Sequence, residues 1–137
     1  MEGGRGGGEE GVTRYLIDAD SSIFAMVDAA SPVTRRIADC VPGEICISVI
    51  SFAEIALGSQ LGKPPPSGLL DAFIEAIPLL PFDEAAARAY ARLPFKRARF
   101  DRLLAAHALS IGATVITNNE ADFADVPGLK VENWTLA

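Results

Sequence analysis

Four acidic residues occupy positions that a solvated surface charge does not readily explain. Asp18 ends an apolar run, Glu54 lies inside an apolar segment, Asp101 opens a helical pattern and Asp122 follows another apolar run. Carboxylates that share one cleft repel one another and resist ionisation unless a cation balances them. Mg²⁺ and Mn²⁺ prefer oxygen ligands, and one or two such ions activate water and neutralise a phosphate. The pattern therefore predicts a metal site for phosphodiester hydrolysis, with these four acids as metal ligands and catalytic residues.

Each acid also has a simpler interpretation that spacing alone leaves open. Asp18 can cap a local loop, and Asp101 is favoured at a helix start by the macrodipole. Glu54 completes an S-x-x-E capping box with Ser51. Asp122 is the least distinctive of the four, because it lies in a turn region that contains other acids.

The elements that would position these acids alternate between strands and helices. Strand-like runs occur at residues 15–17, 45–49 and 113–117, with shorter pieces within 77–82 and 129–131. Helical patterns cover residues 23–27, 32–40, 52–57, 68–76, 84–93 and 98–111. This alternation predicts an α/β fold around a mostly parallel sheet. In such sheets the functional crevice lies at the carboxyl ends of the strands, where Asp18 and the 119–122 turn are expected.

Length and composition are those of one ordinary globular domain: 137 residues, 50% hydrophobic and 22% charged. Residues 1–12 are rich in Gly and Glu, so we expect a disordered lead-in or cloning remnant there, and a single domain over 13–137. No apolar run approaches the roughly 20 residues of a membrane span, and no secretory signal is expected. Cys40 and Cys46 lack metal or redox spacing, which favours reduced thiols and a cytoplasmic location.

The distribution of charge is more informative than its sum. The formal net charge of −6 argues against a nucleic-acid partner. However, the segment from Arg88 to Arg102 carries six basic residues and one acid, Asp101. A basic stretch beside an acidic site suits a polyanion held over a metal centre, although a solvated helix face fits the same pattern.

Three segments resemble a known family. They are YLIDAD, ISVISFAEIALG and FDRLLAAHALSIGATVITNNEADFADVPGLKVENW, and together they span roughly residues 14 to 134. They resemble the PIN-domain ribonucleases, and most closely the VapC toxins of toxin–antitoxin pairs. The resemblance implies a PIN-like three-layer α/β/α sandwich and a metal-dependent endoribonuclease that acts as a toxin. It also implies a homodimer and a VapB-like antitoxin as partner.

The resemblance also assigns roles to individual residues. Asp18, Glu54 and Asp101 match the three central acids of the family, and Asp122 is our choice for the fourth. Asn119 occupies a position that is Asp in many PIN proteins, so we expect it, with Thr117 and Asp20, to support the ligands. The side chains expected to contact the RNA backbone are Arg92, Lys96, Arg97, Arg99 and Arg102.

Two other functions remain as alternatives. The first is a binding module with an acidic pocket and no catalytic activity. The second is a phosphatase of the haloacid-dehalogenase type, because Asp18-Ala19-Asp20 forms a D-x-D sequence after an apolar strand. Those enzymes need a later lysine, and none is convincingly placed here. His107, the only histidine, lies six residues after Asp101 and off its helical face, which favours a packing or surface role.

Overall fold

A sheet of short parallel strands forms the centre of the molecule. The structure is a computed structural model that describes residues 12–95, 97 and 99–136. Within these residues the strands are β2 (Tyr15–Ile17), β3 (Ile45–Ser48), β4 (Leu79–Leu80), β5 (Thr114–Ile116) and β6 (Val131–Glu132). They lie in the order β4-β3-β2-β5-β6, and every neighbouring pair is parallel. Ile17 pairs with Ile47 on one side and Ile116 on the other, so β-branched residues fill the centre.

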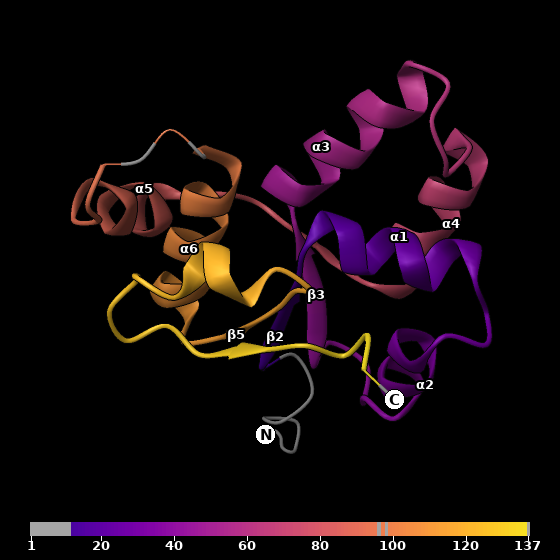
Figure 1. Ribbon diagram of the computed structural model, residues 1–137, viewed down its shortest axis with the longest axis horizontal. Helices are drawn as coiled ribbons and strands as arrows, with labels where there is room; N and C mark the ends of the chain where they lie inside the picture. The colour runs from indigo at the N-terminus through magenta and orange to yellow at the C-terminus, as the bar shows by residue number, and fades with distance from the viewer. Residues whose placement is uncertain (1–11, 96, 98, 137) are drawn as a thin grey trace, which may run out of the picture.

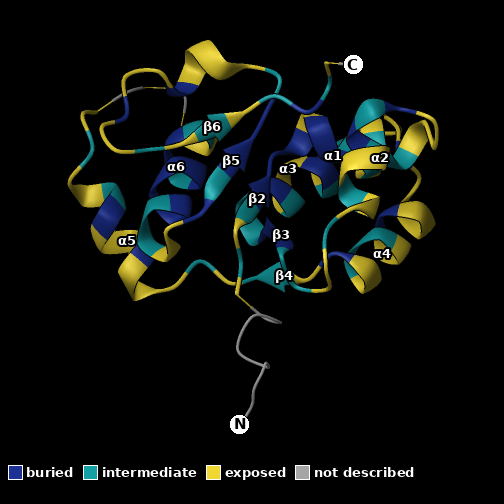
Figure 2. Cartoon of the chain, turned by 90° about the horizontal axis from the view of Figure 1, so that it is seen from below, coloured by how far each residue is buried: buried dark blue, intermediate teal, exposed yellow. Residues whose placement is uncertain are grey.

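Helices cover both faces of this sheet, as the α/β prediction requires (Figure 1). They are α1 (Ala19–Val27), α2 (Pro32–Ala38), α3 (Val49–Gln60), α4 (Ser67–Ala76), α5 (Glu84–Ala91), α6 (Arg99–Ile111) and the 3-10 helix η1 (Glu120–Phe123). Ile17 belongs to a core with residues of α1 to α4, whereas Leu16 belongs to a second core with α6. Figure 2 shows buried residues along the strands between these two helical groups. The three-layer α/β/α sandwich is confirmed.

The start of α3 differs from the prediction. The capping box expected of Ser51 and Glu54 does not form, because β3 runs into α3 without a loop. Ser48 is the N-cap, and its Oγ accepts a hydrogen bond from the Ile50 amide at 3.0 Å. Glu54 consequently lies in the second turn of the helix. Its side chain is therefore free of a capping role.

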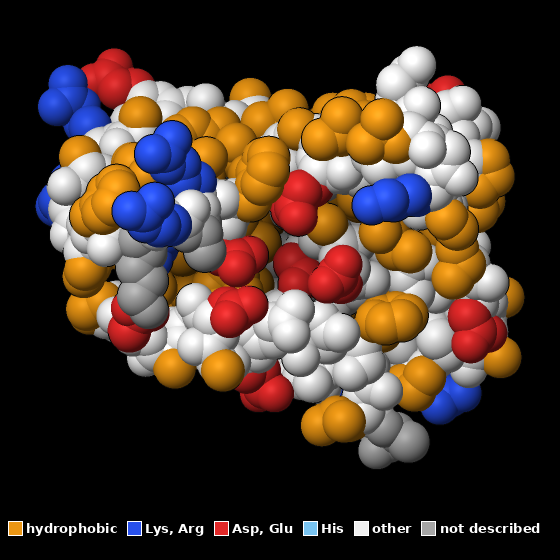
Figure 3. Space-filling view, turned by 45° about the horizontal axis from the view of Figure 1, so that its top comes forward, with side chains coloured by type: hydrophobic (Ala, Val, Ile, Leu, Met, Phe, Trp, Pro, Cys, Tyr) orange, Lys and Arg blue, Asp and Glu red, His pale blue; other side chains and the backbone are white. Residues whose placement is uncertain are grey.

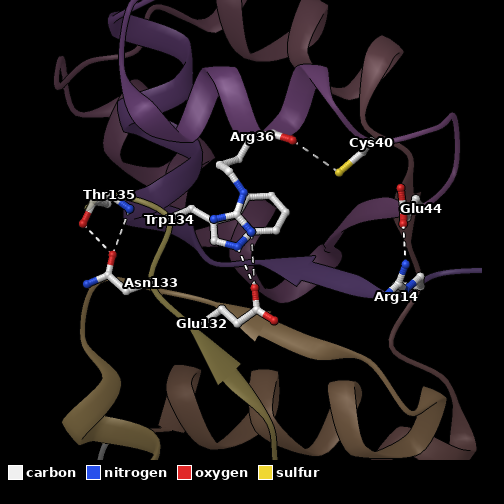
Figure 4. A network of polar contacts seen from close by, with 8 residues as sticks. All are labelled: Arg14, Arg36, Cys40, Glu44, Glu132, Asn133, Trp134 and Thr135. Atoms are coloured by element: carbon white, nitrogen blue, oxygen red, sulfur yellow. Dashed lines mark hydrogen bonds and ion pairs between the residues drawn. The ribbon is translucent and has the colours of Figure 1, made fainter. Parts of the chain in front are cut away.

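The C-terminal segment is fixed by Trp134, whose side chain is 2% exposed. The indole N–H donates to Glu132 at 2.9 Å, and the Arg36 guanidinium of α2 lies 4.6 Å from the indole centroid (Figure 4). The ring of Tyr15 meets the indole edge-on at 4.9 Å. These contacts hold the chain after β6 against α2, and they confirm that Trp134 is a packing anchor.

The expected lead-in, residues 1–12, falls almost entirely outside the described residues. Among the helices that are described, none has the length and apolar character needed to cross a membrane. The two cysteines are free thiols; Cys46 is buried and Cys40 partly so.

Candidate active site

The predicted acids come from elements whose ends meet at one edge of the sheet. Asp18 follows β2, Glu54 lies in the helix that follows β3, and Asp122 lies in η1 after β5. Asp101 is in the first turn of α6. Because the strands are parallel, their carboxyl ends share this edge. Figure 3 shows several acidic side chains around a hollow in the middle of one face, with basic side chains at its sides.

Asp18 is held most firmly. Its side chain is buried, and one carboxylate oxygen accepts a hydrogen bond from the Ser21 amide at 2.8 Å, which makes Asp18 the N-cap of α1. Its own amide donates to the carbonyl of Ile116 in β5 at 2.9 Å. Burial raises the pKa of Asp18, and a hydrogen bond from the Thr117 side chain partly opposes that rise. The capping interpretation is therefore correct, and it does not exclude a role as ligand.

Electrostatic coupling shows that the other acids face the same space. Burial raises the pKa of Glu54 to about 7, with further contributions from the charges of Asp101, Asp20 and Asp18. The pKa of Asp101 is also raised, first by burial and then by the charge of Asp122, followed by Asp18 and Asp20. The charges of the other predicted ligands and of Asp20 thus act on Glu54 or Asp101, so these acids border a shared space.

The connection from β5 to η1 supplies amide and hydroxyl groups to this edge. The Asn119 amide donates to Oγ1 of Thr117 at 3.0 Å, and the Asp122 amide donates to the carbonyl of Asn119 at 3.0 Å. Asn118 was not among the site residues expected from the sequence. Its Oδ1 is buried and has no hydrogen-bond partner among the described residues. Such an atom is typical of a site that is completed by water or a ligand.

The predicted basic set divides into two groups. Arg92, Arg97 and Arg99 are exposed, as an RNA-contacting role requires, and Lys96 lies outside the described residues. Arg102 was wrongly included, because its side chain is 2% exposed and forms an ion pair with Asp125. A buried guanidinium that is paired within the protein is not available to a phosphate backbone.

Comparisons with known proteins identify the family of this chain. The model of the PIN domain family matches residues 17–129. This chain belongs to the PIN-domain family. The "tRNA(fMet)-specific endonuclease VapC" of Shigella flexneri is 29% identical over 89% of this chain and 98% of that protein. "Ribonuclease VapC2" of Rickettsia felis is 30% identical over 88% of this chain and 97% of its own length.

A solved structure supports the same assignment. The DNA-bound VapBC complex from Salmonella typhimurium contains a chain that superposes with a TM-score of 0.76 at 25% identity. The match covers 89% of this chain and 98% of that chain. The expected membership among the VapC ribonucleases of the PIN-domain family is confirmed.

The donor set of this PIN domain fits a hard divalent cation. Asp18, Glu54, Asp101 and Asp122 supply only oxygen atoms. The pKa values of Asp18, Glu54 and Asp101 are raised, and the charge of Arg102 only partly opposes the rise at Asp101. Among the described residues, however, no three acidic, His or Cys side chains converge closely enough to hold one ion. The residues therefore suit an ion held by fewer carboxylates together with water, which is the usual coordination of Mg²⁺.

His107 links the two helices that carry Glu54 and Asp101. Its Nδ1 lies 2.8 Å from Oγ of Ser48, the N-cap of α3, and its ring meets Phe82 edge-on at 5.7 Å. Burial lowers the pKa of His107, which favours the neutral ring. The expected packing role is confirmed, and the hydrogen bond to Ser48 is a feature that sequence spacing did not reveal.

Proposed function

We propose that this PIN-domain protein is a metal-dependent endoribonuclease and the toxin of a toxin–antitoxin pair. The observation that carries the proposal is the raised pKa of Glu54 and Asp101, each caused in part by the other predicted acids. Carboxylates whose charges act on one another at the carboxyl edge of a parallel sheet are suited to a cation and a phosphodiester. The names of the relatives support RNA as the substrate.

The proposed ligands are Asp18, Glu54, Asp101 and Asp122, with Mg²⁺ or Mn²⁺ as the ion. When bound, the ion would activate a water molecule and neutralise charge on the phosphate. Asp18 supplies a carboxylate whose direction is fixed by the α1 cap, and Thr117 orients it through a hydrogen bond. Asn119 and Asp20 stand beside the ligands as supporting groups, and the exposed Arg92, Arg97 and Arg99 hold the RNA backbone.

The partners belong to the same proposal. The similar Salmonella and Rickettsia felis structures are VapBC complexes with DNA. We infer a VapB-like antitoxin for this chain, together with a homodimer and a cytoplasmic location, which suits its free cysteines. An arginine of the antitoxin would pair with the acids in the cleft and compete with the cation.

The alternative of a D-x-D phosphatase is less consistent with the structure. Its nucleophile would be Asp18, which is buried and occupied as a helix cap. Of the lysines within the described residues, Lys63 lies in the connection after α3 and Lys130 precedes β6, at the amino end of that strand. Neither lies at the carboxyl edge of the sheet.

The deciding experiment is cleavage of total cellular RNA by purified, antitoxin-free protein with Mg²⁺, Mn²⁺ or EDTA. Asp101→Asn is the matched variant, because it removes one charge and keeps the side-chain shape. We expect discrete fragments with metal and none with EDTA or the variant. Absence of cleavage by folded protein with either metal would overturn the nuclease and favour the inactive acidic-pocket binding module.

A further inference from the structure

Two phenylalanines flank the end of the α5–α6 connection and expose their rings to solvent. Phe95 is 76% exposed, the largest exposed fraction of any large hydrophobic residue in the described chain, and Phe100 is 45% exposed. In contrast, Phe123 is 2% exposed in the core. Phe95 lies in the connection and Phe100 in the first turn of α6, so two exposed rings lie five residues apart where α6 begins.

The surroundings of these rings are basic, although the whole chain is acidic. Arg97 lies between Phe95 and Phe100 in the sequence, Arg99 directly precedes Phe100, and both arginines are exposed. Arg92, also exposed, caps the end of α5. Figure 3 shows hydrophobic and basic side chains side by side on one flank of the acidic hollow. Aromatic rings interleaved with guanidinium groups suit a ligand that carries both flat bases and phosphates.

The connection leads directly into the site. Phe100 is the residue before Asp101, and consecutive Cα atoms are about 3.8 Å apart. A phosphodiester that reaches Asp101 therefore brings its neighbouring nucleotides to the flank that carries both rings. Unpaired bases stack on aromatic side chains, with about 1–3 kcal/mol for each base, while arginines hold the phosphates.

We propose that Phe95 and Phe100 are stacking platforms for unpaired bases of the RNA, next to the bond that is cut. Arg92, Arg97 and Arg99 hold the phosphates on either side of these bases. The inference rests on the proposed endoribonuclease function, and it specifies the substrate class further. The segment beside the scissile bond is single-stranded, because a base paired within a duplex has no free face to stack on a protein ring.

The first test is fluorescence of Phe95→Trp in an Asp101→Asn background with EDTA, which separates binding from cleavage. The native Trp134 is buried, so the same background without the added tryptophan reports the baseline. The probes are a short single-stranded oligouridylate, an oligoadenylate and an RNA duplex of equal length. We expect quenching by the single strands and several-fold weaker quenching by the duplex. Equal quenching by the duplex, or none by any probe, would overturn the proposal.

Phe24 provides a matched control. It is 42% exposed in α1, a helix without basic residues, and is thus similar to Phe100 in exposure but not in charge surroundings. Phe24→Trp in the same background should show no quenching by the single strands. Quenching as strong as that of Phe95→Trp would mean that any exposed ring reports RNA, and the proposed platform would be rejected.

The second test is kinetic and uses the metal-loaded enzyme. Phe95→Ala and Phe100→Ala should each raise KM for a single-stranded substrate by about 5- to 100-fold, which corresponds to the stacking energy of one base. Tyr at either position should restore KM, and Leu should not. Equal rescue by Leu, or a change of oligomeric state in size-exclusion chromatography, would assign the rings to a protein interface instead. If the wild-type protein cleaves no RNA while the fluorescence results hold, only the proposed nuclease activity fails.

Discussion

The two walls of the acidic cleft are held in place by different means. The first wall is made by β2, α1 and α3, and its Asp18 is fixed by backbone hydrogen bonds as the cap of a helix. The second wall is made by α6 and η1, which carry Asp101 and Asp122. There, Arg102 directly follows Asp101 and pairs with Asp125, three residues after Asp122. Backbone amides and carbonyls hold Asp18 in the first wall, whereas a side-chain ion pair joins the elements of the second.

The largest effect should come from the acid of the first wall. Asp18→Asn removes its charge but retains the cap, since Asn and Asp cap helices about equally well. We expect RNA cleavage to fall by more than about 100-fold, because even changes to outer groups of metal sites cost about 10- to 100-fold. The midpoint of thermal unfolding should change little.

Asp18→Ala is the control for this separation of roles. It should reduce cleavage as much as Asp18→Asn does. It should also lower the free energy of unfolding by about 1 kcal/mol, because the cap is lost. If the Asp18→Asn variant keeps most of the cleavage activity, Asp18 acts only as a helix cap and is not a metal ligand.

Substitutions in the ion pair of the second wall should lower the free energy of unfolding, and the loss should differ between its two partners. Asp125 is 40% exposed, whereas Arg102 is 2% exposed. Asp125→Ala leaves the buried charge of Arg102 without this partner and should lower the free energy of unfolding by about 3 kcal/mol. Arg102→Met leaves a carboxylate that water can reach and should cost about 1 kcal/mol or less.

Denaturant unfolding of both variants measures this asymmetry. Cleavage assays at a temperature where each variant is folded show whether the ion pair also positions Asp122 relative to Asp101. Equal destabilisation by the two substitutions would contradict the assigned difference in burial. The two side chains would then be buried to a similar extent, unlike in the structure.

The same contrast explains what the sequence could predict. Asp18 and Asp101 were found because an apolar pattern ends or begins at each of them, which is a local signal. Arg102 was misassigned because its partner lies 23 residues away, and no local pattern reveals such a pair. Ser51 was expected to cap the helix because the strand-like run extends to residue 49, whereas the strand ends at Ser48 and the helix begins at Val49. The architecture was predictable, since alternating apolar runs and helices allow few arrangements. The ligand set itself stays a prediction.

A smaller effect should follow from Thr117, which joins the two walls at the end of β5. Its hydroxyl donates to Asp18 and accepts from the Asn119 amide. Thr117→Val keeps the shape and removes both hydrogen bonds, so metal affinity should fall by about 10-fold. The measurement is the Mg²⁺ concentration at half-maximal cleavage. Thr117→Ser, which keeps the hydroxyl, should resemble the wild type, and an unchanged Mg²⁺ requirement in Thr117→Val would exclude a supporting role.

The smallest expected effect is the pH dependence of the free energy of unfolding, to which acids of both walls contribute. The pKa of Glu54 is raised from 4.5 to about 7, and those of Asp18 and Asp101 are also raised. In the folded state these acids therefore bind more protons than in the unfolded state, so their contribution to the free energy of unfolding falls as pH rises from about 4.5 to about 7. The lowered pKa of His107 contributes in the opposite direction below its ordinary value of 6.5. The Glu54 carboxyl is partly desolvated, but much of the residue stays accessible to solvent, so screening should limit its share to about 1 kcal/mol.

Thermal unfolding in EDTA, at about pH 5.5 and about pH 7.5, measures this loss, and Glu54→Gln should reduce it. Mg²⁺ binds the ionised carboxylates, so it should restore stability at the higher pH and have little effect at the lower one. Glu54→Gln leaves His107 unchanged, so a pH dependence equal to that of the wild type would mean that Glu54 and the other acids do not repel one another in the folded protein. The cleft would then lack the unbalanced charge on which the proposed metal site depends.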